Sequence, residues 1–151
     1  MPPADALTPV LPAAAPAPAL IAPGALQALS AWGLLVLVDV ALKVAGFDRF
    51  YRMVRAWPTR GAAPAAQRHD RSAKAVAAVY RARTWYFKRA WCLQSAAATV
   101  CLLRLRGVDA TLVIGVRKIP FSAHAWTEVD GVAVNNLHPE TAPLYRVITR
   151  C

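Results

Sequence analysis

The spacing of hydrophobic residues divides the chain into helical segments followed by strands. Apolar positions recur at three- and four-residue steps over residues 25–57, with Gly46 interrupting them, and this predicts two short helices, the second of them basic. A further helical pattern covers residues 72–89. The best-defined helix is predicted over residues 92–106, because its inward positions are apolar and Gly107 is a natural helix stop.

The remaining residues have the alternation typical of strands. Strand-like runs are predicted at 110–116 (ATLVIGV), 123–129 (AHAWTEV) and 132–136 (VAVNN), and Asp130-Gly131 between the last two is a strong hairpin signal. The predicted fold class is therefore α+β, with N-terminal helices followed by a helix packed on a small antiparallel sheet.

Composition divides the chain into four parts. Prolines among alanines predict a mobile tail at the start, and a second Pro/Gly/Ala-rich stretch predicts a linker. The prolines leave only residues 24–38 as an uninterrupted uncharged stretch, shorter than the roughly 20 residues that cross a bilayer, so we expect no membrane association. The predicted parts are a tail (1–24), a helical segment (25–57), a linker (58–68) and a core domain (69–151).

Charge is concentrated in the middle of the chain. The formal net charge is +10, and residues 48–106 alone carry +11, which favours an anionic partner or surface there. Trp85, Tyr86 and Phe87 lie among bases, a pattern that can stack on single-stranded nucleic acid. Without a recognisable nucleic-acid fold, we interpret these bases as a solvated helix face and expect no nucleic-acid partner.

The remaining sequence features argue against several kinds of site and segment. The three cysteines form no CxxC pair, which argues against a disulfide framework, and the spacing of Cys92, His124, His138 and Cys151 follows no metal-ligand pattern. No nucleotide-binding loop is present, so we expect neither metal nor cofactor. No basic residue precedes the first apolar stretch, which argues against a secretory signal and predicts a cytoplasmic protein.

Cys92 is the candidate nucleophile. It begins its predicted helix, where unpaired N–H groups and the helix dipole favour the thiolate form. Cys101 lies nine residues further along the same helix and so points to the opposite face, as an inert buried thiol.

His124 is the candidate general base. Strand alternation places it on one face with Trp126 and Glu128, and a helix packed across the sheet could bring Cys92 to it. The hairpin register determines a third residue. A three-residue turn places Asn136 opposite His124, whereas a two-residue turn moves Asn135 onto that face. Either amide oxygen could fix the imidazole tautomer.

Residues 92–136 also resemble a known family, the leader peptidases (B proteins) of lasso-peptide biosynthesis, in the transglutaminase-like cysteine protease superfamily. The resemblance covers about 45 residues. It rests on the motifs Cys92-Leu93, Leu102-Leu103-Arg104, Arg106-Gly107, Leu112-Val113-Ile114-Gly115-Val116-Arg117, Pro120-Phe121, and Ala123-His124-Ala125-Trp126 with Glu128. These motifs are specific for the family only in combination.

The resemblance implies a transglutaminase-like core with Cys92 as nucleophile and His124 as base. The third catalytic residue of that family is an acidic residue, and its position corresponds to Asn136 in this sequence, with Asn135 and Asp130 as alternatives. The implied reaction separates the leader of a ribosomally made precursor peptide from its core, which an ATP-dependent cyclase then closes. The 91 residues before Cys92 leave no room for a winged-helix recognition domain, so we expect a separate recognition protein as partner.

Two other functions remain open from the sequence. The same thioester could be captured by an amine, as in a transglutaminase. Alternatively, the chain could be a non-catalytic adaptor whose basic face binds nucleic acid or an anionic membrane, in which case binding would weaken steeply with salt.

Overall fold

The computed structural model describes residues 24–87, 91–135 and 144–151, which form three helices and one four-stranded antiparallel sheet. The predicted α+β class is confirmed, whereas the predicted tail lies outside the described residues except for Gly24. The elements are α1 (Ala25–Ala56), α2 (Ala65–Thr84), α3 (Cys92–Leu105), β1 (Thr111–Arg117), β2 (Ser122–Val129), β3 (Val132–Ala133) and β4 (Arg146–Arg150).

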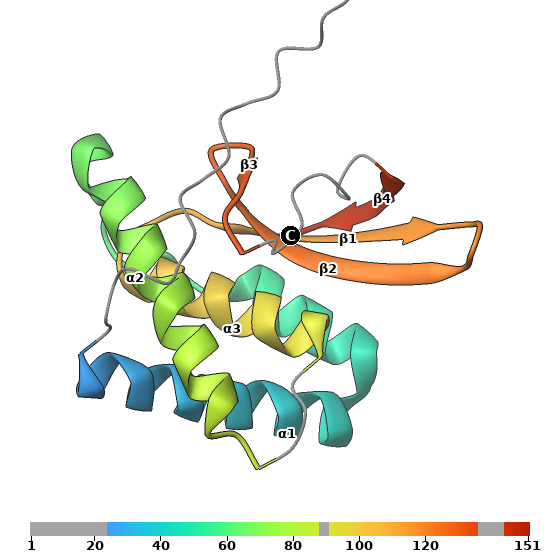
Figure 1. Ribbon diagram of the computed structural model, residues 1–151, viewed down its shortest axis with the longest axis horizontal. Coiled ribbons are helices and arrows are strands. Elements are labelled where there is room, and N and C mark those ends of the chain that lie inside the picture. Colours follow the sequence, from blue (N-terminus) through green and yellow to red (C-terminus); the bar gives the residue numbers. More distant parts are fainter. Residues whose placement is uncertain (1–23, 88–90, 136–143) are drawn as a thin grey trace, which may run out of the picture.

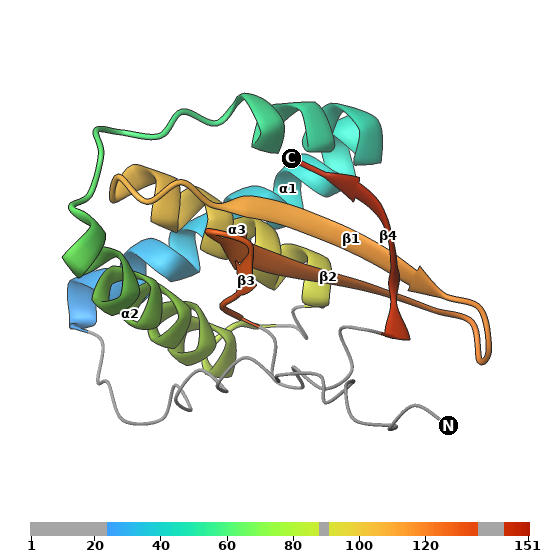
Figure 2. The same ribbon diagram turned by 90° about the horizontal axis from the view of Figure 1, so that it is seen from above.

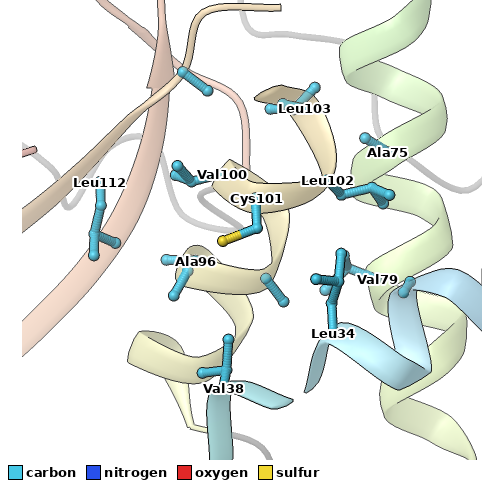
Figure 3. Close-up of a cluster of buried hydrophobic side chains, with 14 of the residues drawn as sticks. Leu34, Val38, Ala75, Val79, Ala96, Val100, Cys101, Leu102, Leu103 and Leu112 are labelled. Atoms are coloured by element: carbon cyan, nitrogen blue, oxygen red, sulfur yellow. The ribbon is translucent and has the colours of Figure 1, made fainter. Parts of the chain in front are cut away.

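Helix α3 lies at the centre of the molecule, between the sheet and α1, with α2 packed beside it (Figure 1). Every residue from Ser95 to Arg104 is buried. The small side chains of Ala96, Ala97 and Ala98 let neighbouring backbones approach closely, as residues of larger volume would not. Figure 3 shows the resulting core, in which Leu34 and Val38 of α1, Ala75 and Val79 of α2 and Leu112 of β1 surround α3.

Helix α1 is broken at Gly46, where the sequence predicts the interruption. Gly46 has φ 75°, a left-handed conformation that glycine adopts without steric cost, and the two halves of α1 run in different directions on either side of it (Figure 2). The bend lets both halves pack on α3. An apolar groove between them is lined by Leu34, Leu37, Val38, Ala41, Phe50, Met53, Val54, Trp57 and Cys101.

The first half of α1 is apolar on both sides. Its inner side packs into the core, but an outer row of apolar side chains stays exposed. By length and composition, α1 could cross a membrane: its most apolar 18-residue window has mean hydropathy 1.9, and 22% of that window is buried. The apolar helix thus extends beyond the uncharged stretch 24–38, because it continues past the buried Asp39. The exposed row consists of Leu26, Leu29, Leu37, Val40 and Val44.

Helix α2 begins earlier and ends earlier than the apolar spacing predicts. It starts at Ala65, directly after Pro64 and inside the predicted linker, because Pro64 precedes a run of good helix-forming residues. It ends at Thr84, so Trp85 and Phe87 follow the helix and are exposed while Tyr86 is buried against α1. The linker between α1 and α2 is therefore shorter than the predicted 58–68.

The strands are ordered β3-β2-β1-β4. Val129 pairs with Val132, and the intervening Asp130 and Gly131 have φ of 50° and 78°, which makes the two-residue turn typical of a hairpin. Of the two registers left open by the sequence, the structure has the one with the shorter turn. Strand β3 ends at Ala133 rather than at position 136. Strand β4 was not predicted: it pairs with β1 and reaches α1, where Tyr51 hydrogen-bonds Thr149 (Figure 2).

A buried arginine joins three parts of the fold at the end of α3. Arg104 is 7% exposed, and its guanidinium donates to the carbonyl oxygens of Ala110 (2.9 Å), Val54 (2.7 Å) and Trp57 (3.3 Å). These bonds connect the end of α1 with the loop that leads into β1. The Val54 oxygen also accepts from the backbone N–H of Trp57, but loss of Arg104 would remove a donor from the buried Ala110 oxygen, which is costly inside a protein.

We expect Arg104→Met to lower the free energy of unfolding by about 2–3 kcal/mol, because it removes three charge-assisted hydrogen bonds to carbonyl oxygens, two of them buried. Urea unfolding followed by circular dichroism measures this change. The matched control is Arg81→Met in the last turn of α2, where Arg81 is exposed. A loss no larger for Arg104→Met than for Arg81→Met would contradict the assigned role.

Candidate functional site

The thiol of Cys92 lies at the first residue of α3, as the sequence predicts. Its pKa is lowered from the ordinary thiol value, chiefly by a hydrogen bond with the His124 side chain. Burial opposes this effect, whereas backbone N–H groups of Ala125 and Leu93 lower the pKa further by donating to the sulfur. The thiolate is thus stabilised both by the opposing imidazole and by the start of its own helix.

His124 lies in β2 opposite Gly115, and the register places it on the same sheet face as Trp126 and Glu128. This alternation agrees with the sequence prediction. Helix α3, however, packs on the other face, which carries Ala125 and Thr127. Cys92 reaches His124 because α3 begins next to β2, so that the end of the helix, rather than its side, brings the thiol to the imidazole.

The distance between α3 and β2 is set by a buried hydrogen bond. Thr127 donates from Oγ1 to the carbonyl oxygen of Ala96, one turn into α3, over 3.0 Å. The backbone N–H of Thr127 donates in turn to Oδ1 of Asn135 (2.6 Å), and the Tyr80 hydroxyl donates to the Asn135 carbonyl oxygen (3.3 Å). These bonds fix β2 against both α3 and α2.

The predicted third residue, Asn136, lies outside the described residues. Both alternatives are described and are engaged elsewhere. Asn135 accepts from the Thr127 backbone, and Asp130 lies in the exposed hairpin turn, where it pairs with Arg68 of α2 at 3.3 Å. The residue that orients the far imidazole nitrogen therefore stays a prediction: the family resemblance implies Asn136, whereas the observed two-residue turn places Asn135 on the His124 face.

Two aromatic rings lie near the His124 imidazole. The Trp126 ring lies nearly parallel to the imidazole, with centroids 6.0 Å apart, and the Tyr145 ring lies 5.5 Å from it at an angle of 42°. The sequence placed Trp126 on the His124 face without giving it a role. Tyr145 was missed, because it lies just before β4, a strand that the sequence reading did not predict.

The other thiols lack this environment. Cys101 is 3% exposed, and burial raises its pKa to about 12, which agrees with the prediction of an inert thiol (Figure 3). Burial also raises the pKa of Cys151, while a hydrogen bond from Tyr51 lowers it. Within the described ranges, no three His, Cys, Asp or Glu side chains gather in a way that could hold a metal ion. The site can therefore supply a thiolate nucleophile and a proton donor, which suits acyl transfer.

Comparisons with known proteins agree with this chemistry. A protein-family model described as the transglutaminase-like superfamily matches residues 34–150. The microcin J25-processing protein McjB of Escherichia coli is 47% identical over 45 residues, which are 30% of this chain and 22% of that protein. The match thus spans about a fifth of the length of that curated relative. No solved structure shows a significant match.

We expect Cys92 to be alkylated by iodoacetamide at lower pH than an ordinary thiol, because a lowered pKa leaves more thiolate below the usual titration range. His124→Ala should shift the pH at which Cys92 becomes reactive to higher values, since it removes the strongest stabilisation of the thiolate. Peptide mapping by mass spectrometry separates the three thiols, and Cys101 serves as the unreactive reference. Equal profiles for the wild type and His124→Ala would contradict the hydrogen-bonded pair.

Proposed function

Because the chain belongs to the transglutaminase-like superfamily, we propose that it is a cysteine protease that removes the leader peptide from a lasso-peptide precursor. One observation carries the proposal: the hydrogen bond between Cys92 and His124, which lowers the thiol pKa within the segment similar to the microcin J25-processing protein. A half-buried thiolate at a helix start, beside a strand imidazole, has the chemistry of a nucleophile and its general acid–base partner.

The reaction begins with attack of the Cys92 thiolate on the carbonyl carbon of the scissile bond. The carbonyl oxygen then becomes an oxyanion, and the backbone N–H of Cys92, which as the first residue of α3 has no acceptor within the helix, would donate to it. Collapse of this intermediate breaks the C–N bond, and the protonated His124 gives its proton to the departing amine.

Water completes the cycle. The leader is then held as a thioester on Cys92, and neutral His124 takes a proton from the attacking water molecule. The thiolate leaves, the leader is released with a new carboxylate, and the imidazole is again protonated. The core peptide departs in the first half of the cycle with a free amine, the group that a separate ATP-dependent cyclase would join to an acidic side chain.

The substrate and its partners belong to the same proposal. The substrate is a precursor peptide with leader and core, and a separate winged-helix recognition protein would present its leader. The surplus of positive charge in residues 48–106 suits an acidic leader or an acidic surface of that recognition protein.

The test is incubation of the precursor peptide with this protein, with and without the recognition protein, followed by mass spectrometry. We expect cleavage at one bond, complete loss with Cys92→Ala, and retention with Cys101→Ala, because Cys101 is buried on the far side of the same helix. Stimulation by the recognition protein would support the two-component system.

Two further arms separate the alternatives. Adding a primary amine yields an amide product if the thioester is captured by amines, and such a product would favour a transglutaminase. Cleavage that survives Cys92→Ala, or no cleavage under any combination, would overturn the protease proposal. Salt-sensitive binding of nucleic acid or anionic vesicles, unaffected by Cys92→Ala, would then favour the adaptor.

A further inference from the structure

We infer that Trp126, held in place by Glu128, is a positioning residue that keeps the His124 imidazole directed at Cys92. The inference rests on the proposed pairing of Cys92 and His124, although it does not depend on the identity of the substrate. It assigns a function to the side chains on the outer face of β2, the face opposite the one on which the side of α3 packs.

The Trp126 indole forms one wall of the space around the imidazole. Trp126 is only 3% exposed, although it lies on the sheet face opposite α3. Its ring is within 22° of parallel to that of His124. Trp126 reaches across β1 at Gly115, the residue paired with His124: a Cβ on Gly115 would lie 3.0 Å from Trp126 Cη2 and 3.0 Å from Tyr145 Cβ. A side chain at position 115 would therefore press on the Trp126 ring and on Tyr145, which glycine leaves undisturbed.

The indole is fixed at its polar end. Trp126 Nε1 donates to Oε1 of Glu128 over 2.9 Å, and Arg150 of β4 is bonded to the other carboxylate oxygen. Both carboxylate oxygens are therefore used, and the Glu128 side chain is only 12% exposed. Glu128 thus links Trp126 to Arg150 of β4, so the side-chain conformation of the indole is determined by the sheet.

Tyr145 completes the enclosure. Its ring lies 5.5 Å from the imidazole, its hydroxyl is 3.3 Å from Oγ of Ser122, and Arg117 lies over its face at 5.7 Å. The imidazole is thus close to two aromatic rings. A histidine on a bare strand face could populate about three staggered χ1 wells, but neighbouring rings restrict this choice.

The walls also affect the charge of the site. The hydrogen bond and the positive charge of His124 both lower the pKa of the Cys92 thiol, and both act only while the imidazole is held beside it. Among the described residues, the ionisable groups that face the imidazole are Cys92 from α3 and Tyr145. Arg117, Glu128 and Arg150 form the next layer behind the two rings. Removal of the Trp126 ring should therefore change how the rate of Cys92 alkylation depends on pH. It should also lower the fraction of molecules in which the imidazole is directed at Cys92.

The test measures Cys92 alkylation by iodoacetamide against pH in the full chain, a readout that needs no peptide substrate. At about pH 6.5, near the ordinary imidazole pKa, Trp126→Leu should lower the alkylation rate about threefold. It should also shift the rise of the rate with pH to higher pH. Trp126→Phe, which keeps a ring, should recover part of the rate. Trp85→Leu is the matched control, since Trp85 is 79% exposed at the end of α2.

Glu128 variants test the tie separately and remain informative if Trp126→Leu fails to fold. Glu128→Ala removes the indole's acceptor and should lower the rate in the same direction, whereas Glu128→Gln keeps an acceptor and should stay close to wild type. Circular dichroism confirms folding of each variant. Wild-type profiles for folded Trp126→Leu and Glu128→Ala, or an equal loss for Glu128→Gln and Glu128→Ala, would overturn the inference. If the proposed protease function alone is wrong, these alkylation differences persist without any precursor cleavage.

Discussion

The structure depends on the close approach of α3 to β2. The nucleophile belongs to the helix and the imidazole to the strand, so their separation follows from how these two elements are packed. Small side chains at Ala96, Ala97 and Ala98 permit the approach, and the buried bond from Thr127 to the Ala96 carbonyl fixes its depth. Because this bond is inside the core, where no water competes for either partner, it is worth more than a surface contact of the same length.

The C-terminal end of α3 is held by the buried side chain of Arg104. Its guanidinium donates to the carbonyl oxygens of Val54, Trp57 and Ala110 and so joins α3 to the end of α1 and to the loop before β1. Gly107 makes the adjoining turn possible: it has φ 75°, and a Cβ there would lie 3.0 Å from the Arg60 carbonyl oxygen. With both ends secured, α3 has little freedom to slide along the sheet, and the position of Cys92 follows from the packing of the whole helix.

The two cysteines of α3 illustrate how environment controls reactivity. Cys92 has backbone and imidazole donors around its sulfur, and the pKa of its thiol is lowered even though burial acts in the opposite direction. Cys101, two and a half turns further on, has the same chemistry but lies among apolar side chains, where burial raises the pKa to about 12. Only the first combines a stabilised thiolate with a neighbouring proton donor, which is the condition for nucleophilic catalysis.

The sequence by itself determined the α+β class, the break at Gly46, the helix that begins at Cys92, the Asp130-Gly131 hairpin and the His124 face of β2. Each of these follows from local chemistry: periodicity, the conformational freedom of glycine, or strand alternation. Only the tertiary structure decided which face of the sheet α3 covers and that Arg104 is buried beneath α1. The same holds for β4, which brings Tyr145 and Arg150 to the rings around His124. These features depend on contacts between residues up to 50 positions apart, which no local pattern encodes.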